Sequence, residues 1–296
     1  MASTTPSYAG QYKLLQLTFA SPGVLHLELN RTPVNAFNPE FWREYGNALD
    51  RISVDADVRV VVVSSALPKL FSAGIDLYAL MTMPGADAGD TARRAILIRQ
   101  FVLDFQHSIS AAERCPYPVI AAVHGQVIGL GLDIIAACDV RLASEDSSFC
   151  VKETAVGFPA DIGTLARVPK LTGNASLLHE LALTARPFGS SEALSLGLIS
   201  RSVPGSRSDV VKVALEVAAE IAQHSPLATL GTKRFLANAR ERTVPEALEY
   251  QATWNMAAVQ APDLEQTARA IMKKEKVQYK PLATWTQSSL ETKSKL

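Results

Sequence analysis

The sequence AAVHGQVIGLGLDIIAACDVRLASEDSSFCVKETAVGFPAD occupies residues 121–161, and the rest of the chain can be arranged around it. The apolar run 118–123, which begins with a proline, is typical of a buried strand. A short apolar segment, 130–138, follows the strand after a turn. Glycines allow positive φ angles and a close approach of the backbone to a ligand, and the turn and the start of the segment contain three: Gly125, Gly129 and Gly131.

Three acids stand in these apolar surroundings, Asp133, Glu153 and Asp161. Buried carboxylates are costly unless they are paired or used. If the glycine-rich turn opens a helix, the first N–H groups of that helix lack internal partners and point outward. Free N–H donors beside buried carboxylates indicate oxyanion stabilisation coupled to proton transfer.

Length and composition narrow the class of protein. The 296 residues are 48% hydrophobic, enough for one large domain or two smaller ones with a sizeable core. The charges balance, with 29 basic and 29 acidic residues, which argues against a nucleic-acid partner. Apolar stretches end well before about 18 residues, so no membrane span is expected. The cysteines have neither metal-ligand nor disulfide-framework spacing, which favours free thiols: Cys115, Cys138 and Cys150.

Both ends of the chain bear on localisation. The first twelve residues contain no Arg, no Lys and no apolar run, which argues against a secretory or mitochondrial presequence. The chain finishes with Ser294, Lys295 and Leu296, the tripeptide read as a peroxisomal address. We therefore expect a peroxisomal protein that binds the import receptor through this signal.

Alternating strands and helices predict an α/β fold with a mostly parallel sheet. The expected strands are 12–19, 24–29, 58–64, 118–123, 139–144, 149–151 and 198–203. The expected helices are 39–53, 91–114, 161–171, 175–184 and 190–196, followed by a nearly all-helical region, 208–276, with breaks before three prolines. The predicted organisation is a flexible N-terminus, an α/β core, a helical region and a flexible tail: 1–11, 12–205, 206–280 and 281–296.

Several motifs together resemble the crotonase, or enoyl-CoA hydratase/isomerase, superfamily. They are FSAGIDL at 71–77, AVHG at 122–125, GLGLD at 129–133 and CDVR at 138–141. The resemblance extends from about residue 15 to about residue 276. It implies a ββα spiral core with a mainly helical C-terminal region, and a homotrimer or homohexamer in which that region mediates trimerisation.

The resemblance also implies an acyl-CoA substrate, with no cofactor and no metal, since coenzyme A is part of the substrate. Family members hold the thioester oxygen with two backbone N–H groups, and the matching positions are Ile75 and Leu130. Two fixed donors stabilise the negative charge that develops on this oxygen when a proton leaves the neighbouring carbon. Further substrate-binding positions carried over from the motifs are Ala73, Gly74, Asp76, Leu77 and Gly129.

The acids distinguish the reactions within the family. Hydratases have glutamates at the positions of Asp133 and Glu153, so the shorter Asp133 disfavours simple hydration. The trio with Asp161 is similar to that of the branch that converts 3,5-dienoyl-CoA to 2,4-dienoyl-CoA in fatty-acid β-oxidation. Because the shift moves a proton between the two ends of the diene, we expect Glu153 to act at the carbon beside the thioester and Asp161 at the remote carbon, with Asp133 as a supporting acid.

Other interpretations remain open. The chain could be a 2-enoyl-CoA hydratase, in a specialised biosynthetic route for instance, or a silent member that only binds acyl-CoA. Asp133 could cap a helix or pair with a neighbour, Glu153 could pair with Arg141 or Lys152, and Asp161 could cap the helix that follows it. The expected walls of the acyl pocket are apolar residues of the segment 77–105: Tyr78, Leu80, Met81, Met83, Leu97, Phe101 and Phe105.

Overall fold

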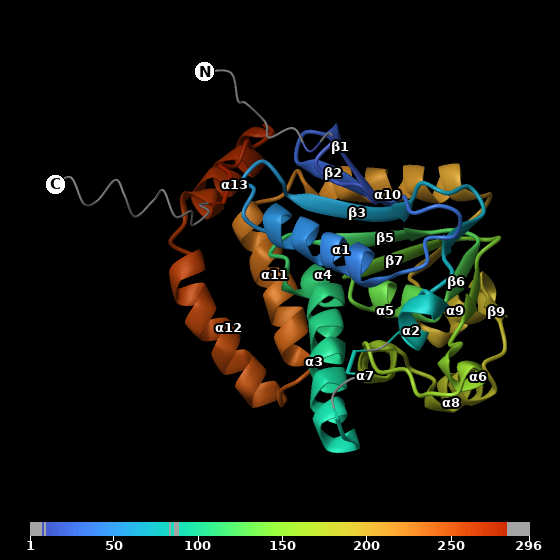
Figure 1. Cartoon of the computed structure of the whole chain (residues 1–296). Helices are drawn as coiled ribbons and strands as arrows, with labels where there is room; N and C mark the ends of the chain where they lie inside the picture. The colour runs from blue at the N-terminus through green and yellow to red at the C-terminus, as the bar shows by residue number, and fades with distance from the viewer. Residues whose placement is uncertain (1–7, 9, 83, 86–88, 283–296) are drawn as a thin grey trace.

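The computed structural model describes residues 8, 10–82, 84–85 and 89–282 (Figure 1). The expected peroxisomal signal at 294–296 lies outside the described residues. The larger of the two sheets in the protein has the strand order β1-β2-β3-β5-β7-β10. The bounds are β1 Leu15–Ser21, β2 Val24–Leu29, β3 Val60–Ser65, β5 Val119–Val123, β7 Val140–Ser144 and β10 Arg201–Val203. Only β1 and β2 pair antiparallel in this sheet, which confirms the predicted mostly parallel α/β architecture.

A second, smaller sheet lies beside the carboxyl ends of the parallel strands and has the order β4-β6-β8-β9. Its strands are β4 Leu70–Ser72, β6 Gln126–Ile128, β8 Ser148–Cys150 and β9 Phe188–Gly189. The prediction placed β4 inside a loop and missed β6 and β9. Strands of two or three residues are too short to show the alternation that identifies a strand in sequence. This sheet carries the two turns that frame the candidate site.

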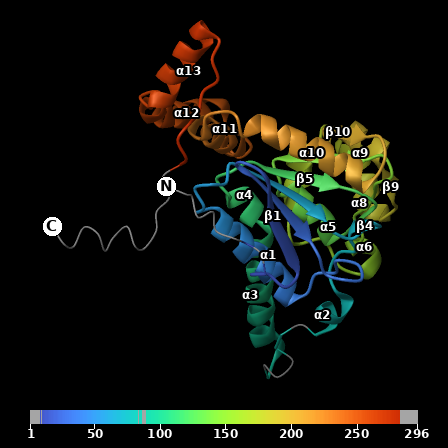
Figure 2. The ribbon, with the colours of Figure 1, turned by 90° about the horizontal axis from the view of Figure 1, so that it is seen from above.

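Alternate residues of the larger sheet face two different apolar layers. Val60 and Val62 of β3 pack with α10 (Arg207–Ile221), whose buried residues include Ala214. Val61 and Val63 point to the opposite layer, which contains α1 (Pro39–Ile52). Figures 1 and 2 show α10 and α1 on opposite faces of the sheet. The continuous apolar runs of the parallel strands follow from this burial on both faces.

Helix α1 begins as predicted. The side-chain oxygen of Asn38 caps it by accepting a hydrogen bond from the Phe41 amide, and a proline follows at the first helical position. Trp42 on α1 stacks on Phe105, with ring centroids 3.9 Å apart. Phe105 belongs to α3 (Thr91–Ile109), and α4 (Ala111–Arg114) follows after a break. The predicted helix 91–114 is therefore two helices. Short helices lie between the strands of the second sheet and after its last strand: α2 Leu77–Met81, α5 Leu130–Ala136, α6 Glu153–Val156, α7 Thr164–Leu171, α8 Ala175–Thr184 and α9 Ser190–Leu196.

The C-terminal helices extend from one side of the core (Figure 2). They are α11 Pro226–Ala239, α12 Val244–Ala258 and α13 Pro262–Lys273, and each begins at or just before one of the predicted proline breaks. Lys233 of α11 is buried and ties the helix to the core through an ion pair with Asp139 at 2.7 Å. Across the described residues, no helix is both long and apolar enough to cross a membrane.

Candidate active site

The two expected oxyanion donors belong to neighbouring turns of the smaller sheet. Ile75 follows β4, and Leu130 opens α5 after β6. Gly74 allows the two turns to meet, because it has a φ of 93° and a Cβ there would lie 2.8 Å from the carbonyl oxygen of Ile128. The same hypothetical Cβ would lie 3.6 Å from the Leu130 amide nitrogen. The fold therefore brings the amide-bearing segments of residues 55 positions apart into contact.

Neither amide is used within the described part of the chain. The Phe37 amide donates to the Gly74 carbonyl, and the Asp76 amide donates to the Phe37 carbonyl. The N–H of Ile75, which lies between these two bonds, donates to no acceptor among the described residues. Leu130 is the first residue of α5, and its N–H cannot have a partner inside the helix. Two unused N–H groups in adjoining turns are the donors that an oxyanion hole requires.

Glu153 lies directly against this turn. A Cβ on Gly129, which has a φ of 50°, would be 2.9 Å from Oε1 of Glu153. Glu153 is only 8% exposed, and its Oε2 has no hydrogen-bond partner among the described residues. Burial raises the pKa of Glu153 to about 7, and the nearby Asp133 charge adds to the increase. A carboxyl group with this pKa can take or give a proton near neutral pH.

Asp133, on α5, is 2% exposed and has a hydrogen-bond partner. Its Oδ1 accepts from the backbone N–H of Thr164, the first residue of α7, at 2.6 Å. Burial raises the pKa of Asp133 to about 6, while the Thr164 amide and the Arg167 guanidinium oppose that increase. The interpretation of Asp133 as a helix-capping acid is thus confirmed, although the helix it caps begins 31 residues later.

Asp161 lies in a more exposed position than the other two acids. Desolvation raises its pKa above the ordinary value for an aspartate. Its backbone carbonyl accepts a hydrogen bond from Gln106 of α3 at 2.6 Å. The interpretation that Asp161 caps the helix after it is wrong: α7 begins at Thr164, and Asp133 supplies the acceptor at its start. The capping preference of aspartate in sequence could not reveal an acceptor from another element.

The three acids line one cavity of about 330 Å³. Its other walls are apolar except for backbone: Ile75, Leu80, Ile98, Phe101, Val102, Phe105, Leu130, Phe158, Pro159 and Ile162. Of the expected wall residues, Leu80, Phe101 and Phe105 do line it. Tyr78, Met81 and Leu97 are not among the lining residues and are exposed, while Met83 lies outside the described residues. Ile98 and Val102 were missed, although they lie one turn of α3 from Phe101 and Phe105.

The remaining substrate-binding positions surround the first turn. Asp76 caps α2 by accepting from the Tyr78 amide, and it pairs with Arg31 at 3.0 Å. Ala73 donates its amide to Val34, and Leu77 is 59% exposed at the start of α2. The Asp76 carboxylate therefore organises the loop that carries Ile75.

Two other sequence interpretations have clear outcomes. The alternative in which Glu153 pairs with Arg141 is wrong, because Arg141 donates to the carbonyls of Leu198 and Cys138. Among the described residues Glu153 has no ion pair with Lys152 either, and the Glu153 side chain lines the cavity. His124 is structural, as expected, since its Nε2 lies 2.8 Å from the Leu67 carbonyl and the residue is 1% exposed.

Two unused amides beside a carboxyl of raised pKa, in an apolar cavity, define an acid–base enzyme acting on a carbonyl compound. The family model Enoyl-CoA hydratase/isomerase matches residues 20–281, and the chain belongs to this family.

Proteins and structures similar to this chain agree with that assignment. It is 44% identical to the rat "Delta(3,5)-Delta(2,4)-dienoyl-CoA isomerase, mitochondrial" over 89% of this chain and 80% of the relative. It is 40% identical to the Arabidopsis thaliana "Delta(3,5)-Delta(2,4)-dienoyl-CoA isomerase, peroxisomal", with coverage of 92% and 98%. A solved enoyl-CoA hydratase from Bacillus anthracis superposes with a TM-score of 0.82 at 28% identity, over 90% of this chain and 99% of that one.

Proposed function

We propose that this enzyme isomerises 3,5-dienoyl-CoA to 2,4-dienoyl-CoA in the breakdown of unsaturated fatty acids. One observation carries the proposal: Glu153 and Asp161 line the same apolar cavity at different depths, one buried beside the unused amides and the other more exposed. A shift of two conjugated double bonds needs acid–base groups at both ends of a five-carbon system. The identity to dienoyl-CoA isomerases over most of the chain supports the same reaction.

In the proposed mechanism, Glu153 takes a proton from C2, the carbon beside the thioester. The electron pair released from the C–H bond delocalises over the thioester and the diene, and the N–H groups of Ile75 and Leu130 stabilise the charge on the thioester oxygen. Asp161, in its protonated form, gives a proton to C6. The double bonds then lie at C2 and C4, and the substrate has neither gained nor lost atoms. No further cofactor takes part in this scheme.

Asp133 acts as a supporting acid in this scheme. Its Oδ1 accepts from the Thr164 amide, which occupies one of the acceptor positions that could otherwise hold a water molecule for hydration. Its charge raises the pKa of Glu153, which strengthens Glu153 as a base. The contact with Thr164 thus supports isomerisation over the hydratase alternative.

The test is an ultraviolet assay of wild type and Asp161→Asn with 3,5-octadienoyl-CoA and with 2-octenoyl-CoA. We expect the wild type to form the 2,4-diene rapidly and Asp161→Asn to lose 10²-fold to 10⁴-fold in rate, about the contribution of one general acid. Asp104→Asn is the matched control, because Asp104 pairs with Arg43 on the exposed side of α3. Rapid hydration of the enoyl substrate, with no diene isomerisation and no effect of Asp161→Asn, would instead establish a hydratase.

Assembly and localisation form a second part of the proposal. Exposed apolar side chains on α12 and α13, such as Leu248 and Ile271, support a trimer or hexamer built through the predicted helical region 206–280. Light scattering at several concentrations tests this assembly. Import into peroxisomes through residues 294–296 is tested by comparing fluorescent fusions with and without the tripeptide. The Arabidopsis relative is named peroxisomal, whereas the rat relative is named mitochondrial.

A further inference from the structure

Arg167 lies behind the candidate site, on the first turns of α7. Its Nη1 sits against the backbone of Gly163, where a Cβ would be only 1.9 Å from this nitrogen. The same hypothetical Cβ would be 3.7 Å from Oδ1 of Asp133. The guanidinium and the Asp133 carboxylate therefore flank one glycine, immediately before the Thr164 amide that binds Asp133.

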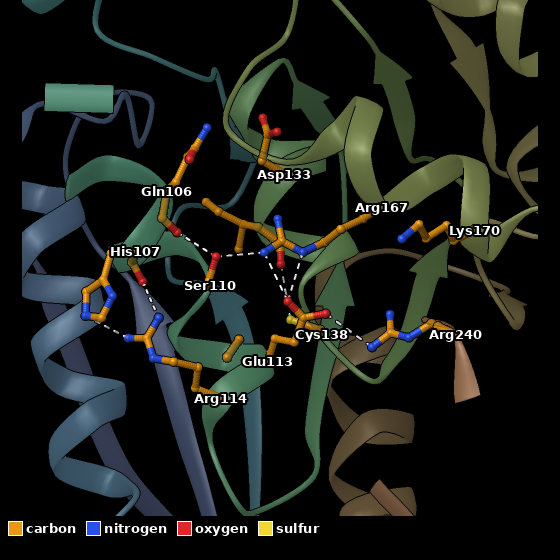
Figure 3. Close-up of polar contacts among 12 residues, drawn as sticks. Gln106, His107, Ser110, Glu113, Arg114, Asp133, Cys138, Arg167, Lys170 and Arg240 are labelled. Atoms are coloured by element: carbon orange, nitrogen blue, oxygen red, sulfur yellow. Dashed lines mark hydrogen bonds and ion pairs between the residues drawn. The ribbon is translucent and has the colours of Figure 1, made fainter. Parts of the chain in front are cut away.

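The guanidinium is held in this place from the opposite side. Its Nε and Nη2 lie 3.2 Å and 3.1 Å from Oε2 of Glu113, and Nη2 also donates to the Ser110 hydroxyl at 2.7 Å. Oε1 of Glu113 accepts from Arg240 at 3.2 Å. Figure 3 shows the Arg167 side chain extending from α7 to Ser110 and Glu113, with Arg240 reaching Glu113 from the far side. A two-nitrogen contact to one carboxylate fixes the plane of the guanidinium as well as its charge.

The contacts of Arg167 with Glu113 and Ser110, which we call the clamp, are partly shielded from solvent. The guanidinium charge is therefore screened less by water and acts more strongly on its neighbours. The Arg167 side chain is 14% exposed and the Glu113 side chain 33% exposed. The groups that face Asp133 are then one cation and two acids: Arg167 from α7, Glu153 from α6 and Asp161 from the preceding loop. Arg167 is the one basic residue among these neighbours.

We propose that Arg167 is a positioning residue for the isomerisation: its clamped guanidinium holds Asp133 as an ionised carboxylate on the Thr164 amide and so sets the charge that Glu153 faces. This inference rests on the proposed function. Arg167 does not line the cavity, so it acts through Asp133 rather than on the substrate. Glu113 and Ser110 would then belong to the machinery of the site, although they lie on its far side.

The sign of the effect follows from the charges. Removing the cation makes the proton harder to remove from Asp133, and the acids titrate as a coupled set. The acid limb of the kcat/KM profile reports loss of the second proton from the coupled pair Asp133 and Glu153, while Asp161 keeps its proton, so this limb should move to higher pH. The shift should be about one pH unit, at the low end for a neighbouring opposite charge. At pH 6, kcat/KM should then fall about tenfold.

The experiment compares the wild type with Arg167→Gln, Arg167→Lys and Arg114→Gln. Each full-length protein is assayed with 3,5-octadienoyl-CoA from pH 5 to pH 9, and thermal unfolding is followed in parallel. Arg114→Gln is the matched control, because it breaks the partly exposed pair with Asp50 on the neighbouring surface of α4. Lysine keeps the charge but cannot reproduce the two-nitrogen fork, so its limb should move in the same direction by a smaller amount.

A limb that stays at the wild-type pH in a folded Arg167→Gln would overturn the inference, as would a uniform loss of rate at every pH. If Arg167→Gln does not fold, Arg167→Lys provides the test. A wild-type rate and a wild-type pH profile in Arg167→Lys would also overturn the inference. A wild type that does not isomerise the diene at all would refute the proposed function instead, so the two failures are distinguishable.

Discussion

The Thr164 amide nitrogen lies 2.6 Å from Oδ1 of Asp133, so an acid of the candidate site also completes the start of a helix. Gly163 precedes Thr164 and has no side chain to cap α7. The two roles of Asp133 are separable, because the hydrogen bond needs an acceptor oxygen, whereas the influence on Glu153 needs a negative charge.

Asp133→Asn and Asp133→Ala should therefore have different consequences. Asparagine retains an acceptor for the Thr164 N–H, so we expect the free energy of unfolding to stay close to that of the wild type. Alanine removes the acceptor and should cost about 1 kcal/mol, the usual contribution of a helix cap. Both variants should lower the rate of isomerisation. Urea unfolding beside the ultraviolet assay checks the split, and equal stability of the two variants would show that the contact with Thr164 contributes nothing.

Glu153→Gln should abolish turnover and preserve binding of the substrate. Glutamine has a similar shape but cannot accept the proton from C2, whereas the amides of Ile75 and Leu130 remain in place. Isothermal titration with a non-reacting saturated acyl-CoA measures binding, and the ultraviolet assay measures turnover. Retained turnover in this variant would remove Glu153 from the proposed mechanism and leave open a chain that only binds acyl-CoA.

The same substitution should change how stability depends on pH. The pKa of Glu153 is raised from 4.5 to about 7, so the folded protein keeps a proton that the unfolded chain has already released. The free energy of unfolding of the wild type should then fall as the pH rises from about 4.5 to about 7, by up to about 3 kcal/mol from this residue. Glu153→Gln should lose that part of the decline. Glu249→Gln, at an exposed position of α12, is the control and should follow the wild type.

Gly74→Ala should reduce catalysis more than stability. Alanine is strained at a φ of 93°, and its Cβ would press on the Ile128 carbonyl, so the two oxyanion turns must move apart. We expect a loss of about 10²-fold to 10³-fold in kcat, as for removal of one oxyanion donor. Gly173→Ala is the comparison, because a Cβ there meets nothing within 4 Å. Similar rates in the two variants would contradict the placement of the oxyanion hole.

Lys233→Met should strongly destabilise the protein. Its ammonium group lies 2.7 Å from Oδ2 of Asp139 and also donates to the carbonyls of Ala112 and Tyr117. The ammonium is buried but the Asp139 side chain is 27% exposed, so the loss of these hydrogen bonds to a charged group should cost about 1.5–3 kcal/mol. Lys170→Met breaks an exposed pair with Glu241 and should cost under about 1 kcal/mol. Urea unfolding of both variants measures the difference.

Much of the fold could be predicted from the sequence, because long elements repeat their pattern. The apolar run of β3 and the Asn38-Pro39 start of α1 are local signals of this kind. The strands of the smaller sheet are set by pairing with segments far away, as when β4 pairs with β6, and nothing within three residues announces this pairing. The start of α7 was misplaced for a similar reason, since its acceptor belongs to α5.

The candidate site also combines residues that local sequence signals identify with residues that only contacts between distant segments reveal. The acids were identifiable because carboxylates are rare in apolar sequence, and the glycine motifs indicated where the backbone makes a close approach. Gln106, which holds the Asp161 carbonyl, and Arg167 could not be singled out, because polar residues at helical spacing are also typical of a solvated face. Only the packing of α3 and α4 against the segment 161–167 assigns them a place beside the site.

The reacting groups of the cavity and most of its apolar walls come from different parts of the chain. The acids and the amides belong to the turns, loops and short helices that follow strands of the second sheet, whereas one helix, α3, contributes four of the apolar wall residues, Ile98, Phe101, Val102 and Phe105. Mutational drift along a single helix face can therefore alter which acyl tails fit, while the reacting groups keep their positions. Descendants of one ancestral isomerase could in this way come to serve different lipids without reinventing the reaction.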